Sequence, residues 1–255
     1  MPGSCFAHLM SPPRFFVDAP LALGASIALP AELAHHAARV LRLRDGAAIV
    51  LFNGSGGEFA GELSIANTGA SARIVAFDAI EREPPLRVTL IQALVAIDKL
   101  DWVIEKSVEL GAARIVVAPA ERSVVRLQAG RAERRLQHWQ AIVRAACGQC
   151  GRNRLPTVEY CASLADALAA ADAAGPRLLL LPTAGAGLPR ITPARHATLA
   201  VGPEGGFSPA EAQLAARVGF VGARLGPRIL RTETAGLAAL AALQALHGDL
   251  AADGD

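Results

Sequence analysis

A single carboxylate lies within a glycine-rich stretch near the C-terminal end of the sequence. Residues 201–211 read VGPEGGFSPAE, so that three glycines and a proline surround Glu204. Glycine allows backbone N–H and C=O groups to approach a ligand closely, and a carboxylate beside them can pair with a cation or accept a proton. The stretch therefore indicates a ligand-binding loop. The alternative is a glycine-rich turn that binds nothing.

The residues on either side of this loop predict a strand before it and a helix after it. The apolar run ATLA precedes the loop, and SPAE follows with Ser208 at the N-cap, Pro209 at the first helical position and Glu211 two positions later. This arrangement is a capping box with the proline that helix starts prefer. In open parallel sheets, ligands bind beyond the carboxyl ends of the strands, so we expect the loop at the ligand-binding edge of a sheet.

Two further junctions have the same character. LGPRILRTETAG (225–236) has a Gly-Pro bend before a predicted helix, and Arg228, Arg231 and Glu233 interrupt its apolar residues. LLLLPTAGAG (178–187) is an apolar strand that runs into a loop with proline and glycine. Three strand ends, each followed by such a loop, can line one pocket. None of them matches the dinucleotide or phosphate-loop fingerprint, so ordinary NAD and nucleoside triphosphate sites are not indicated.

The chain that positions these loops divides into two patterns. Residues 14–80 contain short strands, a glycine-rich hairpin and little helix, which is typical of a small β-barrel. Beyond the stiff, polar segment EREPPLR (81–87), short apolar strands alternate with helices, which predicts a parallel sheet covered on both faces. We therefore expect an α/β protein with a small N-terminal barrel domain over residues 1–80 and a larger domain over residues 81–255.

A basic helix is predicted within residues 30–44. His35, Arg39 and Arg42 are spaced by four and three positions, which places them on one face of that helix. The opposite face is expected to carry Leu33, Ala37 and Val40. A cluster of cations can contact nucleic-acid phosphates, and the alternative is an ordinary solvated helix surface.

Composition and cysteine spacing exclude other classes of protein. Hydrophobic residues make up 52% of the 255 residues, as in a globular protein, and the net charge of +2 permits a polyanionic partner without requiring one. Cys147 and Cys150 form a CxxC pair, but no second pair completes a four-ligand zinc site, so no metal is expected. The sequence has no secretory signal and no apolar run of the roughly 18 residues that span a bilayer. We therefore expect a cytoplasmic protein with no membrane partner.

Six motifs together resemble the RsmE-type ribosomal RNA methyltransferases of the SpoU-TrmD (SPOUT) superfamily. They are RFF, EKSVELGA, ERSVVR, CGQCGRNRLP, GPEGGFSPAE and LGPRILRTETA, and the similarity extends from about Arg14 to Leu246. The resemblance implies an N-terminal PUA-like β-barrel, a C-terminal α/β domain with a trefoil knot, and a homodimer. It also implies S-adenosylmethionine as the cofactor and N3 of one uridine in the 16S rRNA of the small ribosomal subunit as the target. One departure is Gly148, where the family often has glutamate.

The resemblance assigns cofactor binding to the three loops, largely through their backbone groups. The residues expected to contact S-adenosylmethionine are Leu181, Thr183, Gly202, Glu204, Gly205, Gly206, Leu225, Gly226, Ile229, Leu230 and Thr234. Those expected to contact RNA are Arg14, His35, Arg39, Arg42, Arg122 and Arg152.

The chemistry of such a methyl transfer suggests distinct catalytic roles. Uracil N3 must lose its proton, and a nearby cation assists by stabilising the resulting negative charge. Arginine cannot act as a base at neutral pH, so Arg231 or Arg152 is expected to stabilise that charge. Glu204 or Glu233 is expected to accept the proton, although Glu233 alternatively only complements a helix N-terminus and Glu204 alternatively only orients the sulfonium. Two other functions stay open: a knotted methyltransferase acting on tRNA or a ribose 2′-OH, and a non-catalytic RNA-binding protein.

Overall fold

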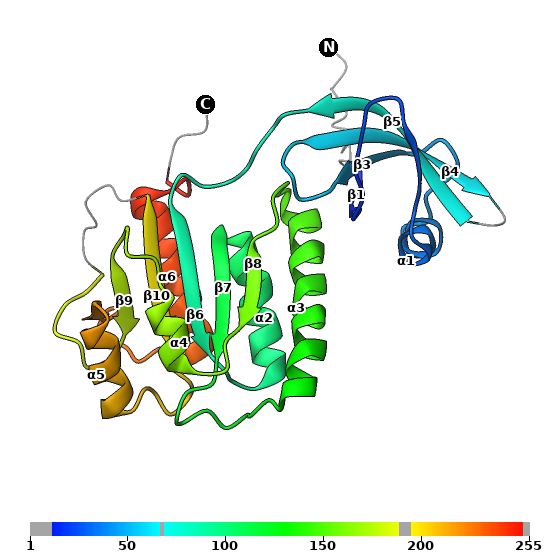
Figure 1. Ribbon diagram of the computed structural model, residues 1–255. Helices are drawn as coiled ribbons and strands as arrows, with labels where there is room; N and C mark the ends of the chain where they lie inside the picture. The colour runs from blue at the N-terminus through cyan, green and yellow to red at the C-terminus, as the bar shows by residue number, and fades with distance from the viewer. Residues whose placement is uncertain (1–11, 67–68, 189–194, 252–255) are drawn as a thin grey trace, which may run out of the picture. The chain divides into compact units, whose positions relative to one another are not determined.

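The computed structural model describes residues 12–66, 69–188 and 195–251, and Cys5 lies outside them. The chain forms two compact units (Figure 1). The first contains the chain up to Arg82 together with Gly151–Arg154, and the second contains Glu83–Cys150 and the chain from Leu155 onward. A short segment from the middle of the sequence thus belongs to the first unit. The predicted division, with one boundary near residue 80, does not include this return of the chain.

The first unit contains a five-stranded sheet in the order β1-β3-β4-β5-β2. Its strands are β1 (Arg14–Phe16), β2 (Ser26–Ala28), β3 (Ala48–Phe52), β4 (Glu58–Ala66) and β5 (Gly69–Asp78). β1 runs parallel to β3, and the other pairs are antiparallel. Along β4 and β5, buried and exposed residues alternate, as in a sheet that is covered on one face. The covered face forms a core that includes Phe15, Leu51, Leu63 and Ile74.

The basic helix of the first unit is shorter and less regular than predicted. Helix α1 covers Ala31–His35 and continues as a π-helical turn, η1, over His36–Val40. The wider π turn changes the direction of the following side chains, and Val40, which was expected on the buried face, is 59% exposed. Arg42 lies beyond the helix with a left-handed backbone (φ 53°). It therefore does not extend a regular helical face, although the predicted basic side chains are all exposed.

The second unit contains a six-stranded sheet in the order β11-β9-β10-β6-β7-β8, with every pair parallel. Its strands are β6 (Arg87–Ala93), β7 (Ala112–Ala118), β8 (Thr157–Tyr160), β9 (Arg177–Leu180), β10 (His196–Val201) and β11 (Phe220–Ala223). Its helices are α2 (Ile97–Glu109), α3 (Ala129–Cys150), α4 (Leu164–Ala169), α5 (Pro209–Arg217) and α6 (Thr232–His247). This order confirms the predicted parallel α/β fold.

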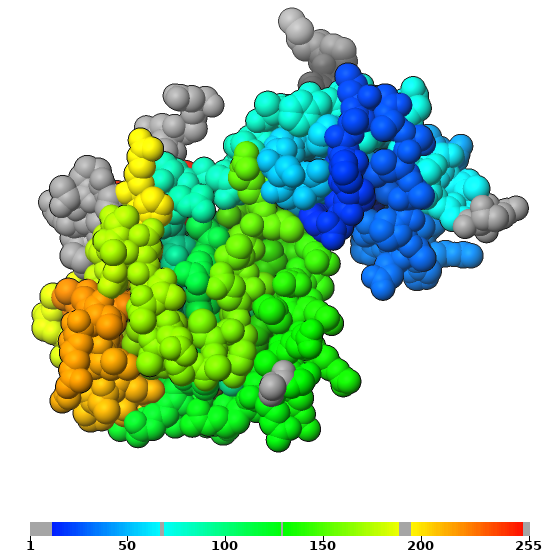
Figure 2. Space-filling model, viewed as in Figure 1, coloured from blue at the N-terminus to red at the C-terminus, as the bar shows by residue number. Residues whose placement is uncertain are grey.

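Helices cover both faces of the parallel sheet. α2 and α6 pack together on one face, and α4 and α5 lie on the other (Figure 1). In the space-filling view, α5 is the orange element on the surface of the second unit (Figure 2). The apolar face of α2 is buried, and its residues are Leu100, Val103, Ile104 and Val108. Among the helices that the structure describes, none combines the length and apolarity needed to span a bilayer.

Candidate active site

The glycine-rich loop after β10 is held at its far end by the predicted capping box. The Ser208 hydroxyl accepts a hydrogen bond from the Glu211 N–H at 3.3 Å, and the Glu211 carboxylate accepts one from the Ser208 N–H at 2.8 Å. The other Glu211 oxygen accepts a hydrogen bond from the Glu121 N–H at 2.7 Å. Gly206 has a φ of +67°, a conformation that favours glycine. The loop is therefore anchored to α5 and to the segment that follows β7.

The near end of the same loop is joined to α6 by buried hydrogen bonds. The Thr232 hydroxyl donates to the carbonyl oxygen of Gly202, and the Gln92 side-chain amide donates to the Thr232 hydroxyl at 3.0 Å. Gln92 lies near the end of β6 and is fully buried, and Thr232 is also buried. Buried polar groups require such partners, so this chain of bonds fixes the first turn of α6 against the loop.

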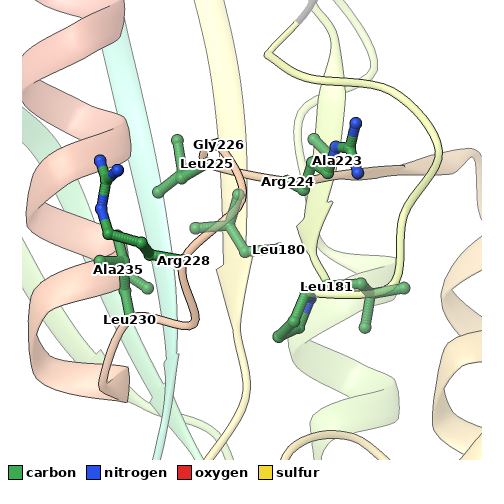
Figure 3. A pocket seen from close by; sticks show the side chains of 10 residues that line it. Leu180, Leu181, Ala223, Arg224, Leu225, Gly226, Arg228, Leu230 and Ala235 are labelled. Atoms are coloured by element: carbon green, nitrogen blue, oxygen red, sulfur yellow. The ribbon is translucent and has the colours of Figure 1, made fainter.

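The loop after β9 lies beside the segment that leads into α6. The Leu181 N–H donates to the carbonyl oxygen of Ala223, at the end of β11, at 2.9 Å. Figure 3 shows Leu180, Leu225 and Leu230 around a small cavity of about 40 Å³. These side chains give that cavity a mainly apolar lining.

A second cavity, of about 530 Å³, is lined by the loop after β10 and by the first turn of α6. It shares Pro182, Leu230 and Ala235 with the smaller cavity. The three predicted loops therefore line adjoining cavities beyond the carboxyl ends of β9, β10 and β11. This is the edge at which parallel α/β sheets bind ligands.

Most residues predicted to bind a cofactor or to act in catalysis line one of these two cavities. They are Leu181, Gly202, Glu204, Gly205, Gly206, Leu225, Gly226, Ile229, Leu230, Arg231 and Glu233. Thr183 and Thr234 line neither cavity, and both are exposed.

Lys99 is a residue of the larger cavity that the sequence pattern did not indicate. Its ammonium nitrogen lies 3.3 Å from Oε1 of Glu204 and 3.5 Å from Oε1 of Glu233. Lys99 stands in α2, more than 100 positions before either carboxylate, so no local spacing connects the three. One sequence signal is available: Lys99 and Lys106 are the only lysines of the chain, whose other strongly basic residues are all arginine.

The residues predicted to contact RNA occupy different environments. Arg122 donates a hydrogen bond to the carbonyl oxygen of Gly205 at 2.9 Å, which places its guanidinium beside the glycine-rich loop. Arg152 is 4% exposed and lines neither cavity. Its expected RNA contact and its alternative role in stabilising negative charge on uracil stay predictions.

Arg14 also lies in an interior position, within the first unit. Its guanidinium donates to Glu58, to the carbonyl oxygen of Gly151 at 3.2 Å and to the side-chain oxygen of Asn153 at 2.5 Å. It also lies over the ring of Phe52, 5.1 Å from the centroid, at a distance typical of a cation–π contact. These contacts give Arg14 a structural role, and its expected contact with RNA stays a prediction.

Two arginines set the charge state of Glu58. Burial alone would raise the pKa of Glu58, but hydrogen bonds and charges from Arg14 and Arg82 outweigh it and hold that pKa below its ordinary value. Arg82 also donates to the carbonyl oxygen of Gly151 at 2.9 Å. Glu58 therefore connects two cations that both hold the segment at Gly151.

The CxxC pair lies in the last turn of α3, and Cys147 is buried. Gly148, at the position where the family often has glutamate, lies in the same turn. Within the described ranges, no three His, Cys, Asp or Glu side chains gather in a group that could hold a metal ion.

Comparisons with known proteins agree with this architecture. An RNA methyltransferase domain matches residues 82–244, and an RNA methyltransferase PUA domain matches residues 29–75. Ribosomal RNA small subunit methyltransferase E of Bacillus subtilis is 31% identical over 88% of this chain and 93% of the relative. The protein of that name from Mycobacterium bovis is 34% identical over 91% of each chain.

Solved structures extend the similarity to three dimensions. The crystal structure of ribosomal RNA small subunit methyltransferase E from Neisseria gonorrhoeae, bound to S-adenosyl methionine, is 38% identical and covers 94% of this chain and 99% of its own, with a TM-score of 0.86. The matched domains and these relatives together cover both units. The chain therefore belongs to the RNA methyltransferase family that includes ribosomal RNA small subunit methyltransferase E, with a PUA domain before the methyltransferase domain.

Proposed function

We propose that this protein transfers a methyl group from S-adenosylmethionine to N3 of a uridine in the 16S rRNA of the small ribosomal subunit. The observation that carries the proposal is the meeting of three loops at adjoining cavities on the ligand edge of the sheet. Relatives with the same domains are small-subunit rRNA methyltransferases, and one of them is bound to the same cofactor.

The lining of the cavities suits S-adenosylmethionine. Leu181, Ile229 and Leu230 offer apolar surface for an adenine ring, and the glycines of the loop after β10 leave backbone groups accessible. Glu204 and Glu233 add negative charge beside these groups, which complements a cationic ligand. When bound, the cofactor supplies a methyl group on a positively charged sulfur.

The cavity also contains the groups that deprotonation of uracil N3 requires. Arg231 lines the cavity and is exposed at the N-cap of α6, where its guanidinium can stabilise negative charge on a uracil oxygen. A carboxylate of the same cavity accepts the proton. Uridine N3 is therefore the target that we assign to this combination of one exposed cation and two carboxylates.

We assign RNA binding to exposed basic side chains. His35, Arg39 and Arg42 are exposed on the first unit, and Arg122 lies beside the loop after β10. A contact with the phosphate backbone of RNA needs only such clustered cations.

We also propose that the protein acts as a homodimer. At the end of α6, Leu246 is 58% exposed and Leu250 is 53% exposed, and Trp102 on the neighbouring helix α2 is 45% exposed. A partner chain would cover exposed apolar side chains such as these, and a standard interface buries roughly 800 Å² on each side. Sedimentation velocity at micromolar concentration is expected to give a dimer, and a purely monomeric boundary would contradict this.

Mapping of modified nucleotides tests the proposed function. Mass spectrometry of 16S rRNA from cells that lack the gene is expected to show one uridine without its methyl group, restored by the native gene. The purified protein is then incubated with S-adenosylmethionine and with either free 16S rRNA or the assembled small subunit. Methyl transfer to neither RNA, or to a ribose hydroxyl, would contradict the proposal.

A further inference from the structure

One lysine holds two carboxylates that come from different elements of the larger cavity. Lys99 lies on α2, Glu204 on the loop after β10, and Glu233 in the first turn of α6. The exposed side-chain fraction is 29% for Lys99, 36% for Glu204 and 16% for Glu233. The ammonium group of Lys99 therefore pairs with one carboxylate that is partly solvated and with another that is largely buried.

Glu233 has an oxygen whose hydrogen-bonding capacity is not used. Lys99 approaches its Oε1, whereas Oε2 is buried and has no hydrogen-bond partner among the described residues. A buried acceptor without a donor costs on the order of 1–3 kcal/mol, so such an atom calls for an explanation. Glu233 lines the larger cavity, so rotation of its carboxylate would bring this oxygen to a donor that arrives with a substrate.

The two carboxylates also differ in how firmly they are held. Glu204 stands at the tip of a glycine-rich loop. Glu233 belongs to a helical turn that Thr232 and Gln92 tie to the sheet through buried hydrogen bonds. Groups on rigid elements keep a reactive geometry better than groups on loops, which favours Glu233 as the reacting carboxylate.

We propose that Glu233 is the proton acceptor of the reaction and that Lys99 is its positioning residue. The inference rests on the proposed methylation of uridine N3. The N3–H bond breaks as its proton moves to Oε2 of Glu233, and the electron pair left on N3 forms the bond to the methyl carbon. The bond between that carbon and sulfur breaks, and sulfur keeps its electron pair. Glu233 afterwards releases the proton to water.

Lys99 acts on Glu233 in two ways. Its positive charge lies beside the carboxylate and complements the ionised form, which is the form that can accept a proton. Its contact with Oε1 also leaves Oε2 as the oxygen without a partner. The other charged groups that line the cavity are Glu204, which shares Lys99, and Arg231, and Arg122 lies beside the same loop. Loss of Lys99 therefore leaves the two carboxylates to repel each other, with Arg231 and Arg122 as the neighbouring cations.

The first experiment observes the Glu233 carboxyl group by NMR, without cofactor or RNA. The protein carries ¹³C at the glutamate carboxyl groups, and the Glu233→Gln variant identifies the signal by its disappearance. Lys99→Met is expected to shift this signal, because the contact between the ammonium group and Oε1 is lost, and Lys99→Arg is expected to restore it largely. Lys106→Met is the matched control, because Lys106 lies on the same helix but pairs with Glu105 and Glu109. An unchanged Glu233 signal in Lys99→Met would overturn the role of Lys99.

The second experiment measures single-turnover methylation of 16S rRNA as a function of pH. The native rate is expected to fall on the acid side as one carboxylate is protonated. Lys99→Met is expected to lower the rate, and Lys99→Arg, which keeps the positive charge, is expected to restore it largely. Glu233→Gln is expected to remove the fall and to lower the rate at least 100-fold, within the usual range for a general base. Glu204→Gln is expected to keep the decrease of the methylation rate at acid pH.

The outcomes separate this inference from the proposed function. A native protein that methylates no RNA contradicts the function, whereas the Glu233 carboxyl signal remains measurable. A native rate that rises tenfold per pH unit from pH 6 to 8.5 means that uridine ionises without a side-chain base, which overturns the role of Glu233. A rate that Lys99→Arg lowers as far as Lys99→Met does would make Lys99 merely structural.

Discussion

Thr232 donates a hydrogen bond to the carbonyl oxygen of Gly202, and this bond joins the first turn of α6 to the glycine-rich loop across 30 positions of sequence. The same hydroxyl accepts a hydrogen bond from Gln92. Two of the cavity's walls therefore depend on one buried hydroxyl group. Its removal tests whether the site is assembled by the fold before any ligand arrives.

Thr232→Val is expected to lower both stability and cofactor affinity. Valine has the same shape but removes the hydroxyl that donates to the Gly202 carbonyl, and it leaves the Gln92 amide with only the Ala93 carbonyl as a partner. An unpaired buried polar group costs about 1–3 kcal/mol. Urea denaturation measures the stability, and calorimetry measures binding of S-adenosylmethionine. Thr234→Val is the matched control, since Thr234 is exposed and lines neither cavity. Equal stability and affinity in the two variants would show that the bond has no organising role.

Gly205→Val is expected to abolish S-adenosylmethionine binding. A Cβ atom at Gly205 would lie 3.0 Å from Cβ of Arg122, so the branched side chain must displace Arg122 or the loop. Calorimetry is expected to give binding to the native protein and none to the variant. Gly130→Ala is the control, because a Cβ at Gly130 meets nothing within 4 Å. Native affinity in a folded Gly205→Val protein would remove this loop from the cofactor site.

Arg39→Ala combined with Arg42→Asn is expected to weaken binding to RNA of any sequence. Asparagine tolerates the left-handed backbone of Arg42, so the change removes charge with little strain. Each lost phosphate contact should reduce the slope of log affinity against log salt by about 0.7–0.9. Filter binding at several salt concentrations measures this slope. Unchanged binding at every salt concentration would make these side chains an ordinary solvated surface.

Arg231→Ala provides the contrasting variant for that experiment. A preorganised group that stabilises the transition state typically contributes ~10²–10³ in rate, so single-turnover methylation should fall by that factor while RNA affinity changes little. A full single-turnover rate would exclude Arg231 from catalysis.

Glu58→Gln is expected to reduce stability near neutral pH and to flatten the acid dependence of unfolding. The pKa of Glu58 is lowered from an ordinary value of 4.5 in the folded protein. Its ionised form therefore contributes stability above about pH 4.5, and this contribution is lost as pH falls through the lowered pKa. Urea denaturation between pH 3 and 7 measures it. Glu62→Gln is the control, because its pair with Arg73 is exposed and such pairs contribute little. Parallel pH profiles of the two variants would contradict this account.

Local patterns predicted the elements that local energetics determine. The capping box at Ser208 was correct, because a helix cap depends on residues a few positions apart. The trefoil knot implied by the family resemblance stays a prediction.

Features set by distant residues were not predictable in this way. The pairing of Lys99 with Glu204 and Glu233 depends on the packing of α2 against α6. The burial of Arg14 depends on residues near Asn153, 139 positions later. The π-helical turn at His36–Val40 was predicted as regular helix, because side-chain spacing alone does not distinguish the two.

The return of Gly151–Arg154 to the first unit limits how the gene can be divided. Asn153 accepts a hydrogen bond from Arg14 and donates one to the carbonyl oxygen of Ile80 at 2.8 Å. A fragment that ends at Arg82 contains both of these partners and every strand of the first sheet, but it would lack Asn153 and with it both bonds. The first sheet and the segment Gly151–Arg154 are thus separated in the gene by nearly 70 codons. Only a gene in which these two parts are joined directly could express that unit by itself.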